Sequence, residues 1–383
     1  MKTVPTTILL MILFIGTLTM CFNFTSASSE PKTITVPDDY EKIQDAINAA
    51  NSGDTILVKA GTYNEELITV NKSVSLVGDE QKSLLYYHSV LGFLVTSNNV
   101  HITGFTITNS EELQGYAVSL ANVSDCVIEN NSIKNNLVGI TVYGRSSGNT
   151  VSGNILDDNE RSIELIDALD NIISENSITG ATVSGISLDL SSGNTVSKNM
   201  ISDITDEFGA LMLWSSPNNT VYRNILNKGT LLIFGSQSNM VTENFVINSE
   251  QGVLIGESSG NTIYRNYFIN VTELVSDTEA LTGQLSQNSW DNGVEGNYWS
   301  NYAGADANGD GIGDYSQVLY EGNQDNYPLM DYPEVSINPE TEQPQTEGSS
   351  SASSALPTEA VYLILVVILI IVAAVAVIKL KKR

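Results

Sequence analysis

A short polar segment recurs along most of this chain, and its repetition is the strongest constraint on the fold. The segment reads SGNTVSGNIL at 147–156, SGNTVSKNMI at 192–201 and SGNTIYRNYF at 259–268. A repeat of about 22 residues is the signature of a solenoid, in which each coil packs only on its neighbours. The Asn residues that mark this period, hereafter the ladder Asn, are Asn131, Asn154, Asn176, Asn199, Asn224, Asn244 and Asn266.

Each repeat also carries short stretches of alternating apolar residues. An aliphatic residue precedes the ladder Asn by three positions and an apolar one follows it by two, as in Val196, Asn199 and Ile201. A second pair recurs in the same register, for example Ile140 and Val142. Alternation indicates strands, and the Gly, Asn and Ser between the stretches indicate turns rather than helices. We therefore predict an all-β fold, a single-stranded right-handed parallel β-helix over residues 33–300.

The ladder Asn have a physical role in such a fold. Asn tolerates the left-handed backbone geometry of tight turns, and stacked Asn side chains can hydrogen-bond to one another along the solenoid. We expect the ladder Asn to occupy left-handed turn positions and to form one such row.

The ends of a solenoid expose backbone groups and apolar surface, so they need caps. The sequence DDYEKIQDAINAANSG at 38–53 predicts a capping helix, with Asp38 as N-cap, Glu41 completing a capping box and Gly53 as the stop. At the other end, residues 297–332 predict a C-terminal cap built around aromatic residues and an Asp/Gly-rich loop.

Both termini carry targeting signals. Residues 1–29 combine Lys2, an apolar run and small residues, which is typical of a secretory signal peptide. Residues 360–378 are uncharged and precede the basic residues 379–383, so we expect a transmembrane helix with a cytoplasmic basic tail. Residues 333–359, rich in Pro, Glu, Ser and Thr, predict a disordered linker. The expected location is the cell membrane, single-pass, with the N-terminal ectodomain outside.

Charge and cysteine content limit the partners. The chain has 17 basic and 44 acidic residues, a formal charge of -27, which repels phosphate backbones, so no nucleic acid partner is expected. Its two cysteines, Cys21 and Cys126, provide no disulfide framework once the signal peptide is removed.

Two regions resemble known families. The segment TITVPDDYEKIQDAINAANSGDTILVKAGTYNE at 33–65 resembles the opening coil of pectin methylesterases and pectate-lyase-like proteins, with Gly61, Tyr63 and Glu65 as their Gly-x-Tyr-x-Glu segment. The Asn-bearing coils and residues 297–330 resemble NosD-like β-helix proteins of the archaeal surface type. The resemblance covers residues 33–332 and implies the fold. It leaves the activity open, since the same solenoid serves lyases, hydrolases, esterases and non-catalytic binders.

Several enzyme classes are weighed against these residues. Leu231 stands where the esterase pattern has a catalytic Asp. A glycosidase needs two carboxylates about 5 to 9.5 Å apart, and we interpret the acids in the loops of consecutive coils as solvated. These acids are Asp157, Asp158, Asp203, Asp206 and Glu207. The candidate bases for a lyase are Arg145, Arg161, Arg223 and Arg265, of which the last two directly precede ladder Asn.

Metal binding is expected at one place. The sequence DANGDGIGD offers Asp306, Asn308, Asp310 and Asp314 as oxygen ligands in the pattern of a calcium loop, although Gln317 replaces the usual Glu. We expect calcium there in a structural role. The copper binding that the NosD resemblance implies is not expected, because His88, His101 and the scattered Met200, Met212, Met240 and Met330 form no cluster in the sequence.

Strand alternation also predicts a binding face. If Ile140 and Val142 and their equivalents point inward, Tyr143 and a later group on three consecutive coils point outward. That group is Met212, Trp214, Leu232, Phe234 and Leu254. Exposed apolar patches mark partner surfaces, and aromatic rings stack on sugars. We therefore expect a non-catalytic surface protein that binds cell-wall or extracellular polysaccharide, or partner proteins. The alternative is a polysaccharide-active enzyme.

Overall fold

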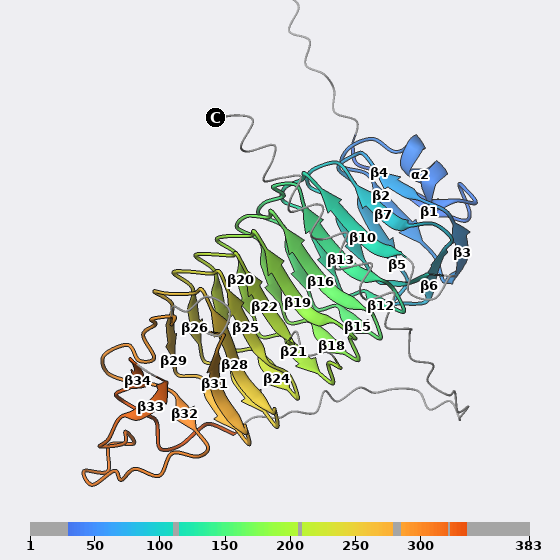
Figure 1. Cartoon of the computed structure of the whole chain (residues 1–383). Coiled ribbons are helices and arrows are strands. Elements are labelled where there is room, and N and C mark those ends of the chain that lie inside the picture. The colour runs from blue at the N-terminus through green and yellow to red at the C-terminus, as the bar shows by residue number, and fades with distance from the viewer. Residues whose placement is uncertain (1–29, 110–114, 206–208, 279–284, 321, 335–383) are drawn as a thin grey trace, which may run out of the picture. The chain divides into compact units, whose positions relative to one another are not determined.

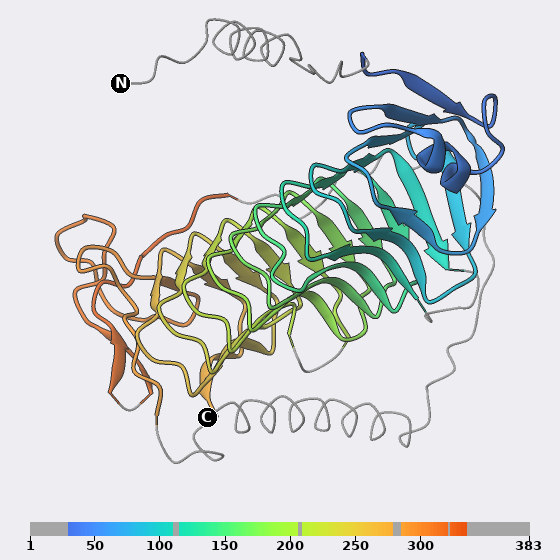
Figure 2. The same ribbon diagram turned by 90° about the horizontal axis from the view of Figure 1, so that it is seen from above.

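Each coil of the chain contributes one strand to each of three parallel sheets, and the coils stack into a right-handed β-helix (Figures 1 and 2). The computed structural model describes residues 30–109, 115–205, 209–278, 285–320 and 322–334. Within these ranges, sheets A, B and C contain 11, 11 and 10 strands. The predicted β-helix with a repeat of roughly 22 residues is confirmed.

The strands follow one another in the order A, B, C around most coils. Sheet A consists of β1 (Thr33–Val36), β2 (Thr55–Val58), β5 (Ser75–Gly78), β8 (His101–Thr103), β11 (Val127–Glu129), β14 (Thr150–Ser152), β17 (Ile172–Ser174), β20 (Thr195–Ser197), β23 (Thr220–Tyr222), β26 (Met240–Thr242) and β29 (Thr262–Tyr264). Sheet B consists of β3 (Gly61–Glu65), β6 (Ser83–Tyr87), β9 (Phe105–Asn109), β12 (Ser132–Lys134), β15 (Ile155–Asp157), β18 (Ser177–Thr179), β21 (Met200–Ser202), β24 (Ile225–Asn227), β27 (Phe245–Ile247), β30 (Tyr267–Ile269) and β32 (Tyr298–Trp299). Sheet C consists of β4 (Ile68–Val70), β7 (Leu91–Val95), β10 (Tyr116–Ala121), β13 (Val138–Tyr143), β16 (Arg161–Ile166), β19 (Ser184–Asp189), β22 (Leu211–Trp214), β25 (Leu231–Phe234), β28 (Gln251–Gly256) and β31 (Glu273–Asp277).

The core runs along the axis of the stack. Ile140 and Val142 are fully buried, and their equivalents from β4 to β28 of sheet C are at most 2% exposed. Val196 of sheet A and Ile201 of sheet B are also fully buried. Neighbouring strands are in register, so Ile140 pairs with Ile163 on the next coil. Fully burying one such aliphatic side chain contributes about 1.5 to 3 kcal/mol. The periodic apolar positions therefore fix which face of every strand points inward.

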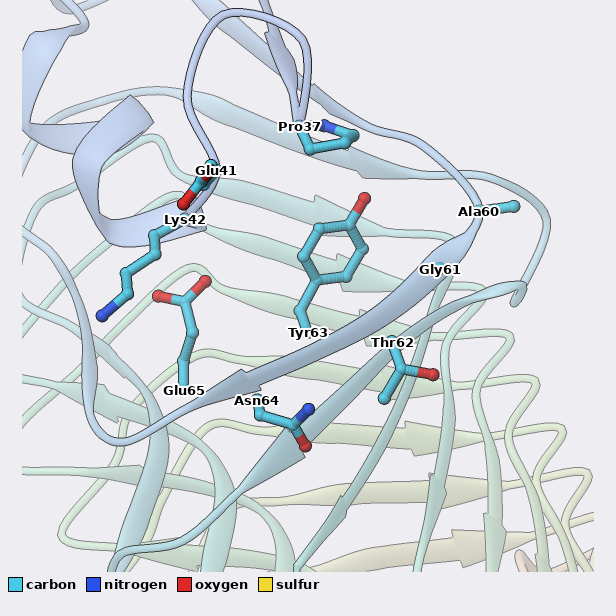
Figure 3. Close-up of a pocket in the computed structure, with 9 residues that line it drawn as sticks. All are labelled: Pro37, Glu41, Lys42, Ala60, Gly61, Thr62, Tyr63, Asn64 and Glu65. Carbon is cyan, nitrogen blue, oxygen red and sulfur yellow. The ribbon is translucent and has the colours of Figure 1, made fainter.

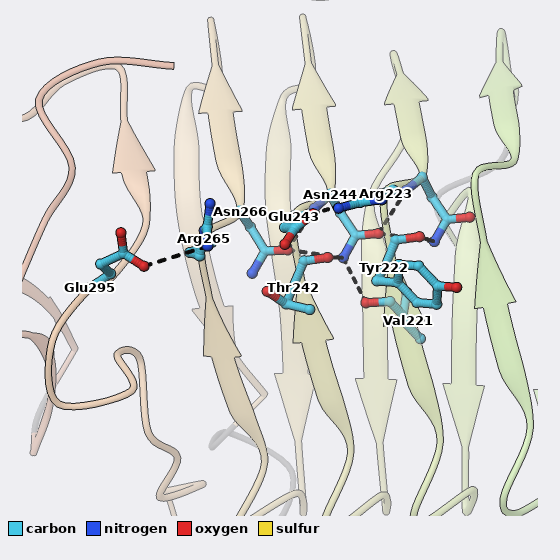
Figure 4. Close-up of polar contacts among 10 residues, drawn as sticks. Val221, Tyr222, Arg223, Thr242, Glu243, Asn244, Arg265, Asn266 and Glu295 are labelled. Atoms are coloured by element: carbon cyan, nitrogen blue, oxygen red, sulfur yellow. Dashed lines mark hydrogen bonds and ion pairs between the residues drawn. The ribbon is translucent and has the colours of Figure 1, made fainter. Parts of the chain in front are cut away.

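The ladder Asn form one hydrogen-bonded row between sheets A and B (Figure 4). Asn176 donates its backbone N–H and its Nδ2 to Asn199 Oδ1, at 3.0 and 2.9 Å. The row continues past the predicted members to Asn297, whose backbone N–H donates to Asp325 Oδ2. Because these residues are buried, each side chain satisfies backbone groups that water does not reach.

The left-handed geometry expected of the ladder Asn lies one residue earlier, so that prediction was wrong. Lys198, Arg223 and Arg265, each directly before a ladder Asn, have φ of +55, +56 and +53°. The turn made there points the Asn inward to bond the row and points the preceding side chain outward. Charged residues at these positions pair across coils, as Lys198 does with Glu175 and Arg223 with Glu243. We call this line of outward turn residues the charged ridge.

A second Asn row connects sheets C and A and was missed from the sequence. It uses the Asn of the SGN half of the repeat and its equivalents, namely Asn149, Asn171, Asn194, Asn219, Asn239, Asn261 and Asn288. Each decapeptide SGNTVSGNIL therefore supplies one Asn to each row. This double use explains why the chain repeats a polar decapeptide so closely.

A helix covers the N-terminal end of the stack (Figures 1 and 2), but its predicted cap was wrong. Helix α2 (Ile43–Ala49) begins after Lys42, well beyond Asp38. Its first backbone N–H groups donate instead to Glu65, from Ile43 to Oε1 at 2.6 Å and from Gln44 to Oε2 at 3.2 Å. Asp38 forms an ion pair with Lys59. A carboxylate from β3 thus replaces the local capping box.

Aromatic residues close the other end. The indoles of Trp290 and Trp299 are buried, and Trp299 stacks on Phe268 of the last coil at 4.5 Å between ring centroids. The short antiparallel pair β33 (Gln317–Tyr320) and β34 (Asn323–Asp325) follows. Trp299 Nε1 donates to Asp325 Oδ2 at 2.8 Å. Asp325 therefore ends the first Asn row and anchors the cap.

The targeting segments fall outside the described residues. These are the signal peptide predicted at 1–29, the linker at 333–359 beyond Glu334, the transmembrane helix at 360–378 and the basic tail at 379–383. In the ranges that the structure covers, no helix has the length and apolar character needed to cross a membrane.

Candidate functional site

The outer face of sheet C carries the predicted binding residues, arranged in columns by the strand register. One column runs Tyr143, Ile166, Asp189, Trp214 and Phe234 over five consecutive coils. The column beside it runs Thr141, Glu164, Ser187, Met212, Leu232 and Leu254. The face therefore changes from a mixture of polar groups with Tyr143 and the exposed Ile166 on β13, β16 and β19 to apolar groups on β22, β25 and β28.

The predicted apolar patch is only partly exposed. Trp214 is 41% exposed, whereas Met212, Phe234, Leu254 and Tyr143 are half-buried. The prediction that Leu232 is exposed was wrong, because only 6% of it is accessible. Met212, Leu232 and Leu254 are register partners one coil apart, so neighbouring side chains in this column cover one another. Trp214 is left as the exposed aromatic of the face.

The indole of Trp214 has one covered and one open side. Its ring stacks on Phe234 with 4.6 Å between centroids and 25° between planes. This distance is close to the spacing of adjacent strands, about 4.8 Å. The two rings therefore stack along the direction of the solenoid axis, with one ring on each coil. Phe234 in turn lies over Gly256, where an added Cβ would meet the ring at 3.0 Å. The open side of Trp214 therefore faces the preceding coil, at its register partner Asp189.

A charged cluster occupies the coils on that open side. Arg161 Nη1 lies 2.9 Å from Glu160 Oε1, and its Nε lies 3.9 Å from Glu164 Oε1. About a fifth of each of these side chains is accessible, which is low for charged groups on an outer face. Tyr116 and Asp189 join the same electrostatic neighbourhood.

The cluster shifts the proton affinity of its carboxyls. Burial raises the pKa of Glu164; Arg161 lowers that pKa again, and Asp189 and Glu160 raise it. Burial also raises the pKa of Asp189, opposed by the hydrogen bond from the Leu190 backbone N–H. These partly desolvated carboxyls can exchange protons or hydrogen-bond a polar ligand. The sequence marked Arg161 as a candidate base, and Glu160 and Glu164 lie beside it in the chain. Only the register shows that Asp189 lies close to Glu164.

The loop acids weighed as a glycosidase pair lie elsewhere. Asp157 Oδ1 accepts a hydrogen bond from Thr179 at 2.6 Å at the end of sheet B, and Asp203 forms an ion pair with Lys228. Asp206 and Glu207 lie outside the described residues. Arg223 and Arg265 belong to the charged ridge, paired with Glu243 and Glu295 (Figure 4). Arg145 lies 4.0 Å from Asp167 at another turn.

A cleft of about 440 Å³ opens at the N-terminal end, between β3 and the segment that precedes α2 (Figure 3). Tyr63 and Glu65, the two titratable residues of the Gly-x-Tyr-x-Glu segment, line this cleft and are used structurally. Tyr63 Oη donates to the Lys59 carbonyl at 2.9 Å, and Glu65 caps α2. Burial raises the pKa of both side chains. The Gly-x-Tyr-x-Glu segment therefore holds the first coil against its cap.

The predicted calcium loop is exposed and closed by its own hydrogen bonds. Asp306 accepts from the backbone N–H groups of Gly309 and Gly311, at 2.7 and 2.9 Å. Asn308 Nδ2 donates to Asp310, and Asp314 accepts from Ala307. Across the described part of the chain, no three His, Cys, Asp or Glu side chains are grouped to hold a metal ion. Calcium binding here stays a prediction.

The soft ligands that copper would need are scattered. His101 on β8 bonds Glu129 at 2.9 Å, and His88 packs edge-on against Tyr86 after β6. Met200, Met212 and Met240 lie on sheets B, C and A respectively. Copper sites require clustered His, Met or Cys. The described residues therefore do not fit a copper centre, and no chemistry is assigned to one.

Fold and repeat together define a right-handed β-helix protein with two Asn rows. The family described as periplasmic copper-binding protein (NosD) matches residues 47–234 and 227–304, more than half of the chain. The chain therefore belongs to the NosD family.

One relative and two solved structures illustrate the likeness. A cell surface glycoprotein of Methanothermus fervidus is 28% identical over 333 residues, covering 72% of this chain. The chain spans about half of that relative, 54% of its length. The Dettilon tailspike protein matches with a TM-score of 0.53 at 12% identity, over 67% of this chain and 59% of that one. The DFA-IIIase of Arthrobacter chlorophenolicus A6 without its lid matches with a TM-score of 0.52 at 11% identity, over 70% of this chain and 95% of that one. At such identities the structures share the fold alone.

Proposed function

We propose that this protein is an extracellular surface protein that binds a polysaccharide along the outer face of sheet C. The observation that carries the proposal is the open side of Trp214, which faces the polar coils of Asp189 and Glu164. An exposed indole bordered by hydrogen-bonding groups suits a sugar ring, whose flat apolar side stacks while its hydroxyls bond laterally.

The surface location draws on two further points. The relative in Methanothermus fervidus is named a cell surface glycoprotein. The sequence predicts a signal peptide at 1–29 and an anchor at 360–378, with the β-helix outside the membrane. Partner proteins remain the alternative occupants of the face, and competition between them and a polysaccharide is measurable.

The test is affinity electrophoresis of the full chain, in mild detergent, through gels containing dextran, laminarin, galactomannan or xylan. We expect retardation in at least one neutral polysaccharide. Trp214→Ala removes the stacking surface, and losing a central aromatic contact costs about 2 kcal/mol, or about 30-fold in affinity. Trp214→Phe keeps a ring on Phe234 and retains part of the binding.

The matched control is Tyr264→Ala, which removes a half-buried aromatic from the outer face of sheet A. This variant is expected to bind as the unaltered chain does. If none of the four polysaccharides retards the chain, or if Trp214→Ala binds normally while remaining folded by circular dichroism, the proposal is wrong.

A further inference from the structure

The charged cluster beside Trp214 contains two neighbouring carboxyls, which the binding of a polysaccharide alone does not require. Glu164 and Asp189 lie on the same outer face of neighbouring strands, because Glu164 pairs with Ser187 and Asp189 is two residues further along β19. A strand rise of about 3.3 Å and a strand spacing of about 4.8 Å place their Cα atoms about 8 Å apart. Inverting glycosidases hold their two carboxyl groups about 6.5 to 9.5 Å apart, leaving room for a water molecule. Side chains that extend outward from two Cα atoms about 8 Å apart can reach such a separation.

A buried hydroxyl on the same face also points to a ligand. Gly185 faces inward, since an added Cβ would lie 2.5 Å from the side chain of Ile201, so the preceding Ser184 faces outward. Ser184 is the register partner of Arg161 and is 1% exposed. Its Oγ has no hydrogen-bond partner. An unpaired buried hydroxyl is unfavourable by about 1 to 3 kcal/mol. The position of Ser184 on this face is therefore an observation separate from the two acids, and it too suggests a ligand that forms hydrogen bonds.

We propose that Glu164 and Asp189 form a catalytic acid and base that hydrolyse a glycosidic bond of a neutral polysaccharide, with inversion at the anomeric carbon. This inference rests on the proposed function, because the sugar that stacks on the open side of Trp214 lies over the coil of Asp189. The geometry gives the two carboxyls different environments. Glu164 lies beside Arg161 and Glu160, whereas Asp189 lies one coil further along.

The reaction is balanced with water as the second reactant. Glu164, protonated, gives its proton to the glycosidic oxygen as the bond from that oxygen to the anomeric carbon breaks. Water adds to the anomeric carbon from the opposite side, and Asp189 takes the proton that the water releases. The products are two shorter chains, and the two carboxyls recover their starting protonation through solvent. The raised pKa of Glu164 favours its role as the acid.

Charge identifies the class of substrate. Glu160 and Glu164 pair with the guanidinium of Arg161, and Asp189 is close enough to Glu164 to raise its pKa. The whole chain carries -27. A uronate or sulfated polymer is repelled by such a face, while a neutral polysaccharide is not. Arg161 holds Glu160 and Glu164 in place and acts as a positioning residue.

The experiment measures reducing ends released by the full chain from whichever neutral polysaccharide retards it in the affinity gel, with polygalacturonate as the anionic comparison. We expect release from the neutral polymer alone. Glu164→Gln and Asp189→Asn each lower the rate by about 10²- to 10⁴-fold, the usual contribution of acid–base catalysis. Gel retardation falls far less than the rate, because Gln and Asn keep hydrogen-bonding groups at the two positions. Glu175→Gln on the charged ridge is the matched control and keeps the full rate. Proton NMR of the first product shows the inverted anomer.

The outcomes separate the two proposals. Binding without release of reducing ends overturns the catalytic inference and leaves the binding function intact. Absence of binding overturns both. Release with retention of configuration, or an undiminished rate in Asp189→Asn, overturns the assignment of Asp189 as base. Because the stereochemistry is measured on the unaltered chain, it remains decisive even if a variant fails to fold.

Discussion

The first Asn row makes a sharp prediction at Asn199, in the middle of the stack. Asn199 Oδ1 accepts two hydrogen bonds from Asn176, and its Nδ2 donates to the carbonyls of Ile173 and Ser197 and to Asn224 Oδ1. All of these contacts are made by a residue that is almost fully buried. Replacing Asn199 therefore changes the hydrogen bonding of three consecutive coils.

The magnitude follows from the groups left without partners. In Asn199→Leu, the Asn176 backbone N–H loses its acceptor and the Ile173 carbonyl loses a donor. Each orphaned buried group costs about 1 to 3 kcal/mol, so the free energy of unfolding falls by about 4 kcal/mol. Leu has the same branched arrangement of heavy atoms as Asn but bulkier methyl groups, so it leaves no cavity and any overpacking adds to the loss. Asn199→Ala leaves the same groups without partners and adds a small cavity, so it is expected to be destabilised as well.

Urea unfolding, followed by far-UV circular dichroism, measures this loss as a lower transition midpoint. The control is Asn64→Ala, which removes an exposed Asn from the outer face of β3 and changes stability by less than about 0.5 kcal/mol. If Asn199→Leu unfolds at the same urea concentration as the control, the row does not stabilise the stack and the reasoning is refuted.

Three further predictions concern the caps. Burial raises the pKa of Asp325 to about 6 from an ordinary value of 3.8. The folded state therefore holds this proton where the unfolded chain has lost it, and stability should fall by up to about 3 kcal/mol as pH rises from about 4 to 6. Asp325→Asn should flatten this part of a plot of melting temperature against pH, and an unchanged slope would exclude Asp325 as its cause. Glu65→Ala removes the cap of α2 and should lower stability by about 1 to 2 kcal/mol in urea, whereas Glu65→Gln keeps one acceptor and loses less. If the Asp/Gly-rich loop binds calcium, 1 mM Ca²⁺ raises the melting temperature relative to chelator, and Asp306→Ala abolishes the difference; equal melting temperatures with and without chelator would contradict it.

The fold was predictable because one physical signal repeats many times. Apolar alternation at Ile140 and Val142, and at the equivalent positions of other coils, fixes the inward face of sheet C. The repeat length of about 22 residues determines which residues of consecutive coils lie beside one another. The turns were less predictable, since positive φ falls at Lys198 and its equivalents, most of which are charged residues with no preference for that geometry. The cap of α2 was missed because Glu65 is 21 or more residues away from the N–H groups that it binds.

The candidate site depended on neighbours across coils, which sequence alone gives only approximately. Alternation correctly places Trp214 outward, but it does not show that Leu232 is covered by its register partners Met212 and Leu254. Likewise, Arg161 and Asp189 lie 28 residues apart in sequence, and only the strand register brings their coils together.

Some positions on this solenoid are held by packing or by hydrogen bonds and others are not, and this difference explains where function can reside. Inward residues are constrained by packing, and the two Asn rows by buried hydrogen bonds. On the charged ridge, the cations Lys198, Arg223 and Arg265 are each engaged by a carboxylate on a neighbouring coil or in the cap. Residues on the outer face of sheet C meet neither constraint, because their side chains point away from the core and belong to neither Asn row. A binding or catalytic group can therefore change on that face without disturbing the stack, and it is there that Trp214, Arg161 and two partly desolvated carboxyls come together.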